Sequence, residues 1–471
     1  QEAGARLDQD GNSKMIGLFD DPTLPRYNYA RDVDYASGAC IAVRTEQFLD
    51  FGGFDRDFAP AYCEDCDLCF KYTSNGLRVR YEPKSKIYHH LSVSSNALPG
   101  SYKMRQVRKN QQLLLERWGS EIDAANDVRI ISLYLPQFHA IPENDRWWGP
   151  GFTEWTNVNR ALPNFSGHYQ PHRPAELGSY DLTNSEIMER QAKLAKRYGV
   201  QGFCYYYYSF SGRRVLEEPL ERMLESGTPD MPFCICWANE NWTRTWDGQE
   251  KDVLLEQKYR KQDDEEIIRD LIRYLRQPNY IRIDGKPLLV VYRPQLLPNA
   301  KATAKLWRDI CRKEGLGEIY LCFMEVFEAA RTYPKPADIG FDASIEFPPS
   351  NTSFPTNIPG EVFNSDFQGT VSDYRRIVET YASEPVPGHT RFRGVMPSWD
   401  NTARRQNNAY IFQNASPGAF QAWLEYIIEQ TKDQNSAEER IVFVNAWNEW
   451  AEGAHLEPDQ KHGRGWLEAV R

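Results

Sequence analysis

Two glutamates near the C-terminal end of the sequence, Glu449 and Glu452, have the type and spacing that glycoside chemistry uses. One protonated carboxyl serves the leaving oxygen, and one ionised carboxylate acts as base or nucleophile. The two side chains share a face if the chain turns helically after Trp447, whereas on a strand they point apart. The alternative is that the glutamates pair with arginine or cap a helix. Because Trp447 and Trp450 flank the pair, the sugar interpretation and this alternative are equally favoured.

Aromatic and amide side chains gather in a second segment, residues 237–247, which holds three Trp, two Asn and one Arg. Such a segment is typical of a sugar-binding lip, because Trp faces stack on sugar rings and amides bind hydroxyls. A packed, Trp-rich loop is the alternative. With neighbouring strand ends included, the expected substrate-binding residues are Trp237, Asn239, Glu240, Asn241, Trp242, Tyr206, His139, Trp155, Trp399, Asn448, Trp450 and His455.

The elements that must position these residues form a regular alternation after Asp127. Eight apolar runs read as strands: 130–138, 200–208, 232–238, 287–292, 319–326, 341–347, 392–399 and 441–447. Stretches of helical periodicity lie between most of them: 187–198, 216–224, 267–275, 302–312, 374–381 and 419–431. This order predicts a (β/α)8 barrel, whose chemistry lies at the C-terminal ends of the strands. A doubly wound open sheet is the alternative, but no glycine-rich dinucleotide fingerprint follows these strands.

Length and composition limit the number of domains and the class of protein. A chain of 471 residues predicts two or three domains, and the polar stretch from Gly119 to Asp127 marks a boundary. The net charge of -10 argues against a general affinity for nucleic acid or an anionic membrane. No apolar run approaches the ~18 residues of a membrane-spanning helix. Nine cysteines, an odd number, indicate reduced thiols, so we expect a cytoplasmic protein.

Three of these cysteines, Cys63, Cys66 and Cys69, have a C-x2-C-x2-C spacing that also occurs at iron–sulfur sites. No fourth cysteine followed by proline completes the pattern, and acidic and apolar residues interrupt it. Ordinary buried thiols are therefore the favoured interpretation.

Several longer motifs carry a resemblance to a known family. The segments 133–139 (LYLPQFH), 147–149 (WWG), 151–158 (GFTEWTNV), 236–242 (CWANENW) and 445–458 resemble the WbsX-type glycosyltransferases. That family is similar to glycoside hydrolase family 99, the endo-acting α-mannosidases and mannanases. The resemblance covers nearly all of residues 128–471 and implies a (β/α)8 barrel with a site that needs no metal.

The resemblance also implies roles for the two glutamates. In family 99 a motif Asn-Glu-Trp-x-Glu-Gly holds the catalytic pair, which corresponds here to Glu449 and Glu452. Glu449 would deprotonate the sugar's 2-hydroxyl, giving a 1,2-anhydro sugar and retention of configuration, and Glu452 would be the acid and later the base. Ala451 and His455 depart from the hydrolase pattern, which puts the substrate and the hydrolytic outcome in question.

Residues 1–126 resemble the C-terminal half of a family 2 glycosyltransferase of the GT-A fold. The carrying motifs are 34–40, 52–55, 62–68, 75–76, 81–83 and His89-His90. The resemblance implies Asp65 as the acceptor-side base and His90, or His89, as a ligand of the metal–diphosphate, with Mg or Mn as the metal. The nucleotide-binding half would precede Gln1. We therefore expect a piece of a larger bifunctional protein, with nucleotide sugar bound only by the full-length chain.

Together these features predict an enzyme of surface-polysaccharide metabolism, of the O-antigen or capsule type. The barrel would cleave or transfer α-linked, mannose-like residues of an oligosaccharide or polysaccharide. Two alternatives stay open, namely a barrel that acts purely as a glycosyltransferase and one that binds glycan without catalysis.

Overall fold

The computed structural model describes residues 3–7, 10–18, 21–23, 30–88, 100–125, 128–244, 249–260 and 262–471. The chain divides into two compact units, Gln1–Asp127 and Val128–Arg471. Among the described residues no helix combines the length and the apolar character that crossing a membrane requires.

The larger unit is built on eight parallel strands that close into a barrel. Each strand pairs with the next in the order β5, β6, β8, β12, β13, β14, β16, β18, and β18 pairs with β5. The strands read as continuous apolar runs because one face lies in the barrel and the other lies under helices. All eight expected strands are confirmed: β5 (Arg129–Tyr134), β6 (Gly202–Phe210), β8 (Phe233–Trp237), β12 (Lys286–Val291), β13 (Tyr320–Met324), β14 (Ala343–Ile345), β16 (Arg391–Val395) and β18 (Ile441–Val444).

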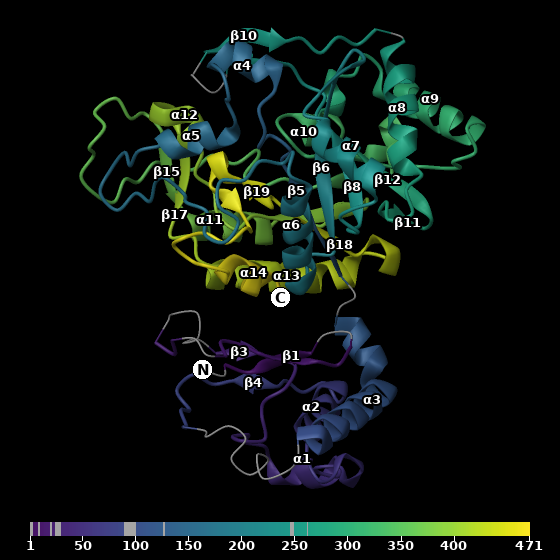
Figure 1. Ribbon diagram of the computed structural model, residues 1–471, viewed down its shortest axis with the longest axis vertical. Coiled ribbons are helices and arrows are strands. Elements are labelled where there is room, and N and C mark those ends of the chain that lie inside the picture. The colour runs from purple at the N-terminus through teal and green to yellow at the C-terminus, as the bar shows by residue number, and fades with distance from the viewer. Residues whose placement is uncertain are drawn as a thin grey trace. The chain divides into compact units, whose positions relative to one another are not determined.

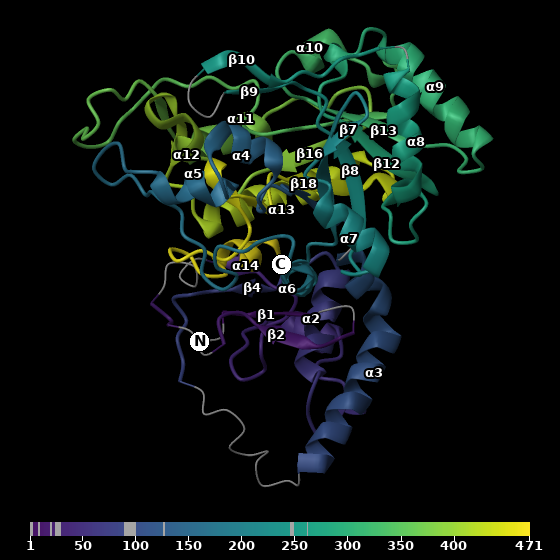
Figure 2. The same ribbon diagram turned by 45° about the horizontal axis from the view of Figure 1, so that its top comes forward.

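Helices cover the outside of the barrel, and α8 packs beside α9 as α13 packs beside α14 (Figures 1 and 2). Side-chain caps begin several of them, as where the Asn184 side chain accepts a hydrogen bond from the Glu186 N–H. The six expected helices are confirmed, and a seventh follows the last strand: α6 (Ser185–Arg197), α7 (Glu218–Ser226), α8 (Asp263–Leu275), α9 (Ala300–Lys313), α11 (Tyr374–Ala382), α13 (Pro417–Gln434) and α14 (Gly465–Val470). The expected (β/α)8 architecture is therefore confirmed.

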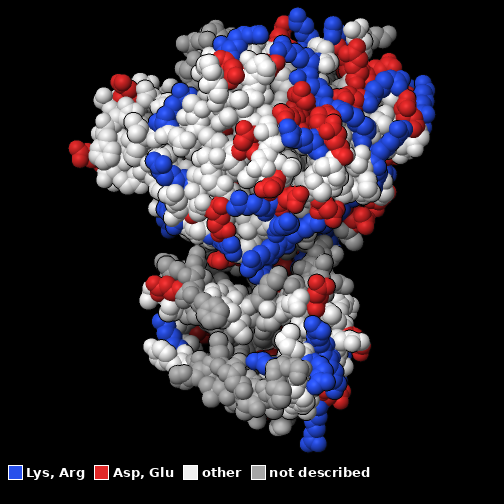
Figure 3. Space-filling view, in the orientation of Figure 1, with Lys and Arg blue, Asp and Glu red and all other residues white. Residues whose placement is uncertain are grey.

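The exposed faces of α8 and α9 carry both signs of charge. On the side shown in Figure 3, lysine and arginine are interspersed with aspartate and glutamate over these helices. Arg269 illustrates the pattern, because it pairs with Glu265 one turn earlier and with Glu314 beyond the end of α9. Exposed pairs of this kind contribute little to stability, so the surface is solvated without a strong field of one sign.

Three loops at the C-terminal ends of strands contact one another. The first, after β5, contains α4 (Pro142–Trp148) and α5 (Glu154–Arg160), and the second, after β16, contains α12 (Thr402–Arg405). The third, after β18, is a short hairpin of β19 (Asn448–Glu449) and β20 (Ala454–His455) around a 3-10 turn, Trp450–Glu452. Gly453 ends that turn at φ +61°, and a Cβ there would lie 3.0 Å from the backbone nitrogen of Asp400. Glycine is therefore needed for the close approach of the second and third loops.

Shorter elements complete the larger unit: β7 (Arg213–Val215), β9 (Trp242–Arg244), β10 (Gln249–Leu255), β11 (Arg282–Ile283), α10 (Ala329–Thr332), β15 (Thr370–Asp373) and β17 (Tyr410–Gln413). The pairs β9–β10 and β6–β7 are antiparallel, and β15 pairs with β17 in parallel.

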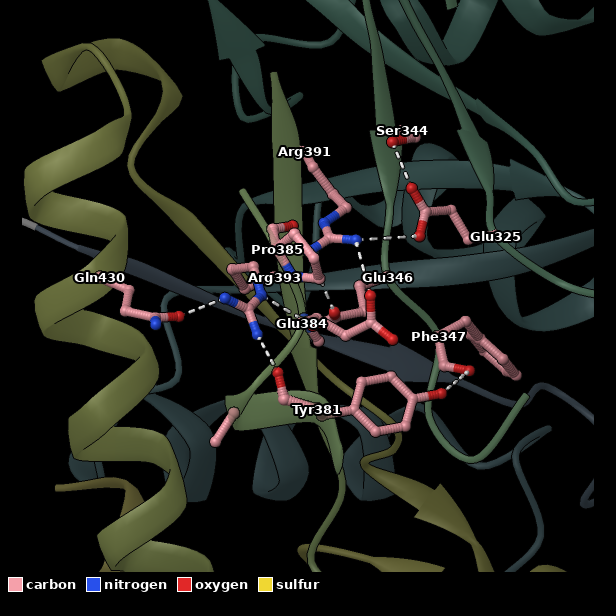
Figure 4. A network of polar contacts seen from close by, with 12 residues as sticks. Glu325, Ser344, Glu346, Phe347, Tyr381, Glu384, Pro385, Arg391, Arg393 and Gln430 are labelled. Carbon is pink, nitrogen blue, oxygen red and sulfur yellow. Dashed lines mark hydrogen bonds and ion pairs between the residues drawn. The ribbon is translucent and has the colours of Figure 1, made fainter. Parts of the chain in front are cut away.

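A network of buried charges joins β14 and β16 to the helices outside them (Figure 4). Arg393, only 2% exposed, donates from Nε to Glu346 at 2.9 Å and from Nη2 to the Tyr381 carbonyl at 2.6 Å. Its Nη1 reaches Gln430 of α13. Nearby, Arg391 lies 3.8 Å from Glu325. The network faces the helix layer, because its partners come from α11, α13 and the strands beneath them.

Arg393→Met is expected to lower the free energy of unfolding of the barrel by about 3–5 kcal/mol, because the buried Glu346 carboxylate would lose its hydrogen-bonded cation and retain the Gly394 N–H and Arg391, which is 3.7 Å away. The double variant with Glu346→Leu removes both charges and should recover most of that loss. Urea denaturation of the two variants measures the difference. A single variant as stable as the wild type would show that the pair contributes nothing.

The smaller unit has two short sheets and a helical layer. Its described elements are β1 (Ala5–Leu7), β2 (Ser13–Met15), β3 (Arg31–Asp32), α1 (Thr45–Asp50), α2 (Glu64–Ser74), β4 (Arg80–Tyr81) and α3 (Gly100–Ala125). The helix that periodicity predicts from Met104 to Trp118 lies within α3. A small core joins α2 and α3 to the strands and includes Tyr35, Phe58, Phe70 and Leu114.

Candidate active site

One arginine holds three glutamates at the C-terminal end of the barrel. Arg404 donates from Nε to Glu154 at 2.6 Å, from Nη1 to Glu452 at 2.6 Å and from Nη2 to Glu449 at 2.8 Å. We call these four residues the arginine clamp. A guanidinium suits this arrangement because its nitrogens form a rigid, planar fork of donors.

Each member of the clamp comes from one of the three converging loops. Glu154 begins α5 and Arg404 lies on α12, while Glu449 directly precedes the 3-10 turn after β18 and Glu452 is its last residue. The chain therefore does turn helically after Glu449, and this turn brings Glu449 and Glu452 to the same guanidinium. The shared face is what the sugar interpretation expects, and the pairing with an arginine is what the alternative expects.

Asp400 fixes the second loop against the third. Its carboxylate accepts hydrogen bonds from the Thr402 N–H and hydroxyl at the start of α12, while its own N–H donates to the Glu452 carbonyl at 2.7 Å. His168 Nδ1 accepts from the Asn164 N–H, so Nε2 carries the proton that it donates to Asp400. The hydrogen bond from the Asp400 N–H to the Glu452 carbonyl therefore positions both the loop that carries Arg404 and the turn that carries Glu452.

The electrostatics of the clamp favour one retained proton. Burial raises the pKa of both Glu449 and Glu452, and repulsion from Glu154 raises it further, while Arg404 opposes the rise. Glu449 is the more buried of the two, since the Glu452 side chain is 19% exposed. One guanidinium faces three buried carboxylates, and this arrangement favours a proton on the pair. A pair with one proton supplies both an acid and a base.

A fourth carboxylate, Glu457, lies behind the clamp and holds the neighbouring tryptophans. It is fully buried and accepts hydrogen bonds from the indoles of Trp447 and Trp450, at 2.9 and 2.7 Å. Gln191 and Tyr180 donate to it as well, at 2.7 and 2.8 Å. Burial raises the pKa of Glu457 to about 7 in spite of these four donors. Glu457 orients the turn that carries the candidate pair, but it does not touch the clamp's guanidinium.

Three residues expected to bind sugar form a buried aromatic stack instead. The Trp450 ring stacks on the His455 ring with the ring centroids 3.8 Å apart, and the Trp155 ring lies tilted against Trp450 at 5.6 Å. All three are buried, and the Trp155 indole donates to the Tyr180 carbonyl. A sugar cannot stack on rings without an exposed face, so Trp155, Trp450 and His455 support the site from behind.

Asn448 also has a positioning role in this structure. Its side chain accepts from the Leu135 N–H at 2.7 Å and donates to the Leu135 carbonyl at 2.9 Å, which links the last strand end to the first. Asn239 acts in the same way between β8 and β12, where its amide bonds the N–H and the carbonyl of Arg293. Buried amides used by the backbone in this way have few groups left for a substrate.

The other lip residues divide into two groups. Trp237 is buried against Trp307 of α9 and so faces the helix layer rather than the site. Asn241 is exposed and caps the Gln257 N–H. Trp399 and His139 are buried, and burial lowers the pKa of the His139 imidazole. None of these four residues touches the arginine clamp in the part of the chain that the structure describes.

Tyr206, Glu240 and Trp242 remain candidates for substrate contact. Tyr206 and Tyr208, on one face of β6, interact electrostatically with Glu449, whereas Tyr205 and Tyr207 face other packing partners. This division follows the strand alternation expected for the four tyrosines. Glu240, half-buried, pairs with Arg293 at 3.3 Å and interacts with Glu452. Trp242 is half-buried, and its ring lies 5.3 Å from that of Tyr208.

Sequence reasoning missed two members of the clamp. Glu154 lies inside a quoted motif, GFTEW, but no pattern connects it with residues almost 300 positions away. Arg404 follows the seventh strand, beside Trp399, and the only available signal was a basic residue close after a strand end. A buried acidic pair needs a cation, so the search for one at another strand end could have found Arg404.

In the smaller unit, Asp65 lies in the first turn of α2 and accepts the Gly38 N–H at 3.0 Å. Its role as a base stays a prediction. His89 and His90 lie outside the described residues. Cys66 and Cys69 are buried in the core, and burial raises the pKa of both thiols, as the buried-thiol interpretation expects. No cluster of His, Cys, Asp and Glu suited to a metal occurs among the residues that the structure describes.

A closed (β/α)8 barrel with paired carboxylates at its C-terminal strand ends is an architecture that carbohydrate-active enzymes use. Residues 130–470 match the model of the family described as Glycosyltransferase WbsX. The chain therefore belongs to the WbsX glycosyltransferase family and is a glycosyl-processing enzyme.

Individual proteins are similar to the chain over different lengths. The chain is 47% identical over 344 residues to the protein WxcX of Xanthomonas campestris pv. campestris, which covers 73% of this chain and 49% of WxcX. The chain thus spans about half the length of the curated relatives it matches first. A shorter match, 32% over 80 residues, relates 17% of the chain to 30% of the rhamnosyltransferase WbbL of Escherichia coli K12. The GH99 endo-alpha-mannosidase of Bacteroides thetaiotaomicron is 15% identical, with a TM-score of 0.44 over 73% of this chain and 95% of that one.

Proposed function

We propose that the barrel cleaves or transfers α-linked, mannose-like glycosyl residues with retention of configuration, as part of surface-polysaccharide metabolism. The observation that carries the proposal is the pair Glu449 and Glu452, held by Arg404 at the C-terminal end of the barrel. The substrate is an oligosaccharide or polysaccharide, and a nucleotide sugar enters only if the longer protein binds one.

In the first step Glu449 takes the proton of the sugar's 2-hydroxyl, and that oxygen attacks the anomeric carbon. A 1,2-anhydro sugar forms while the bond from the anomeric carbon to the leaving oxygen breaks. Glu452 gives its proton to the leaving oxygen, so the fragment departs as an alcohol. In the second step water or an acceptor hydroxyl attacks the anomeric carbon and loses its proton to Glu452, and Glu449 returns a proton to the 2-oxygen.

The resting site favours the proton on Glu449, the more buried carboxylate, whereas the first step needs it on Glu452. A bound 2-hydroxyl resolves this difference, because a hydrogen bond donated to Glu449 stabilises its ionised form. The proton then resides on Glu452. This carboxyl is the more exposed of the two, so a bound substrate can reach it with its leaving oxygen. The proposed steps use only these side chains and require no metal ion.

The test is a panel of α-mannosides, including glycosyl fluorides and acidic or deoxy-sugar oligomers, incubated with the full chain and a chelator and followed by mass spectrometry. We expect free sugar or a lengthened chain, and we expect both to disappear with Glu449→Gln. Glu325→Gln is the control, since Glu325 lies at a strand end but contacts Ser344 and Arg391 rather than Arg404. Turnover that persists in Glu449→Gln would contradict the proposal. Binding of oligosaccharide without product would favour the non-catalytic alternative.

A further inference from the structure

We propose that Glu154 and Arg404 form a positioning ion pair for the proposed acid and base, which lets Glu449 and Glu452 keep one proton between them at neutral pH. This inference rests on the proposed function. Its basis is the geometry of the clamp, in which each of the three guanidinium nitrogens bonds a different carboxylate.

The Glu154 side chain interacts with Arg404 rather than with other polar groups. Its side chain is completely buried, and within the described part of the chain its hydrogen bond to Arg404 is the one that it makes, because its second oxygen has no partner. A buried carboxylate is costly unless it is paired. The side chain is therefore matched to the arginine rather than to the backbone or to neighbouring polar groups.

Glu154 is held by its own helix, which packs against the catalytic turn. It is the first residue of α5, whose start is fixed by a capping box between Thr153 and Thr156. The next residue, Trp155, packs into the buried aromatic stack. Arg404 is thus held from one side by a carboxylate on a separate loop, at the Nε that neither Glu449 nor Glu452 uses, so this bond is available whichever of the two carries the proton.

The charge of Glu154 also decides how strongly Arg404 acts on the pair. With Glu154 present, one positive charge is shared among three carboxylates, so the pair retains a proton more easily. Without that charge Arg404 would be free to stabilise the ionised forms of Glu449 and Glu452, and the repulsion from Glu154 would also be lost. Both changes act in the same direction, toward loss of the shared proton.

Other ionisable groups around the pair do not replace Glu154. Burial raises the pKa of Tyr206 and Tyr208 on β6, and of Tyr292 after β12, so these phenols stay neutral. Glu240, after β8, shares its charge with Arg293. From α12 itself, Arg405 favours the ionised form of Glu452 and so works against the proton. Among the residues that the structure describes, retention of the proton is therefore left to burial, mutual repulsion and Glu154.

The test compares wild type, Glu154→Gln and Glu154→Asp, with Glu325→Gln as the matched control. Carbon-13 labelling of glutamate carboxyl carbons lets NMR follow the titration of Glu449, whose signal is assigned by its loss in Glu449→Gln. We expect Glu154→Gln to lower the titration midpoint by about one pH unit or more, because an uncompensated arginine lowers a carboxyl pKa by that amount. Glu154→Asp, which keeps the charge, should return the midpoint toward the wild-type value, and Glu325→Gln should leave it unchanged.

If turnover is found, the high-pH limb of the pH–rate profile should move down by the same interval in Glu154→Gln. A lower midpoint without turnover in any variant would sustain the ion pair and count against the proposed function. An unchanged midpoint in a folded Glu154→Gln, with kcat lowered equally at every pH, would show a merely structural role and overturn the inference. If Glu154→Gln does not fold, the titration midpoint of Glu449 is measured in Glu154→Asp. A midpoint equal to that of the wild type sustains the inference, and a midpoint lower by one pH unit overturns it.

Discussion

Glu452→Gln is expected to lower kcat on an α-mannoside with an alcohol leaving group by about 10²-fold or more, because an amide cannot give a proton to the departing oxygen. A glycosyl fluoride needs little or no proton on its leaving group, so the same variant should lose much less activity on the fluoride. The measurement is kcat on both substrates, taken below the high-pH limb of the wild-type profile.

The size of the effect separates an acid from a binding group. A residue that only binds substrate would raise KM for both substrates alike. Loss of Glu452 as acid lowers kcat for the alcohol far more than for the fluoride, on which it slows only the second step, where Glu452 is the base. Glu325→Gln again serves as the control, because it changes a half-buried glutamate near an arginine outside the clamp. Equal losses on both substrates would remove Glu452 from the role of acid and leave it as a ligand or a structural residue.

The architecture could be predicted from the sequence because it depends on local patterns. Each of the eight strands is an apolar run long enough to be buried on both faces, and each expected helix has a periodic apolar stripe. Those signals survive in a single sequence because they reflect contacts with many neighbours at once. The turn that brings Glu449 and Glu452 together could be predicted for the same reason, because residues three positions apart lie on one face of a helical turn.

The clamp could not be predicted because it depends on side-chain direction across long sequence distances. Trp155 and Trp450 were expected to present faces to sugar, yet their indole N–H groups are used by the Tyr180 carbonyl and by Glu457, which turns the rings inward. Residue type indicates what a side chain is able to bind, and only the fold decides whether that partner is the protein itself. The same limitation applies to Arg404, whose partners come from two other loops.

Glu457→Leu is expected to lower the free energy of unfolding of the barrel by about 3–5 kcal/mol, the range seen when one member of a buried polar network is removed. Four buried donors, on Trp447, Trp450, Gln191 and Tyr180, would lose their acceptor together. Urea denaturation followed by tryptophan fluorescence measures the loss. Glu457→Gln is the matched variant, because it keeps one acceptor oxygen and should lose less.

The same carboxylate predicts a pH dependence of stability with a definite sign. Because burial raises the pKa of folded Glu457 from its ordinary 4.5 to about 7, the folded state binds more protons than the unfolded state between those values. The stabilisation is therefore fully present below about pH 4.5 and is lost as pH rises through 7, with a slope of at most about 1.4 kcal/mol per pH unit for one proton. Glu449 and Glu452 add slopes of the same sign, so the contribution of Glu457 is the difference between wild type and Glu457→Gln. If that difference is flat from pH 4.5 to 7, the four donors hold Glu457 ionised throughout, and the indole bonds, rather than burial, determine its charge.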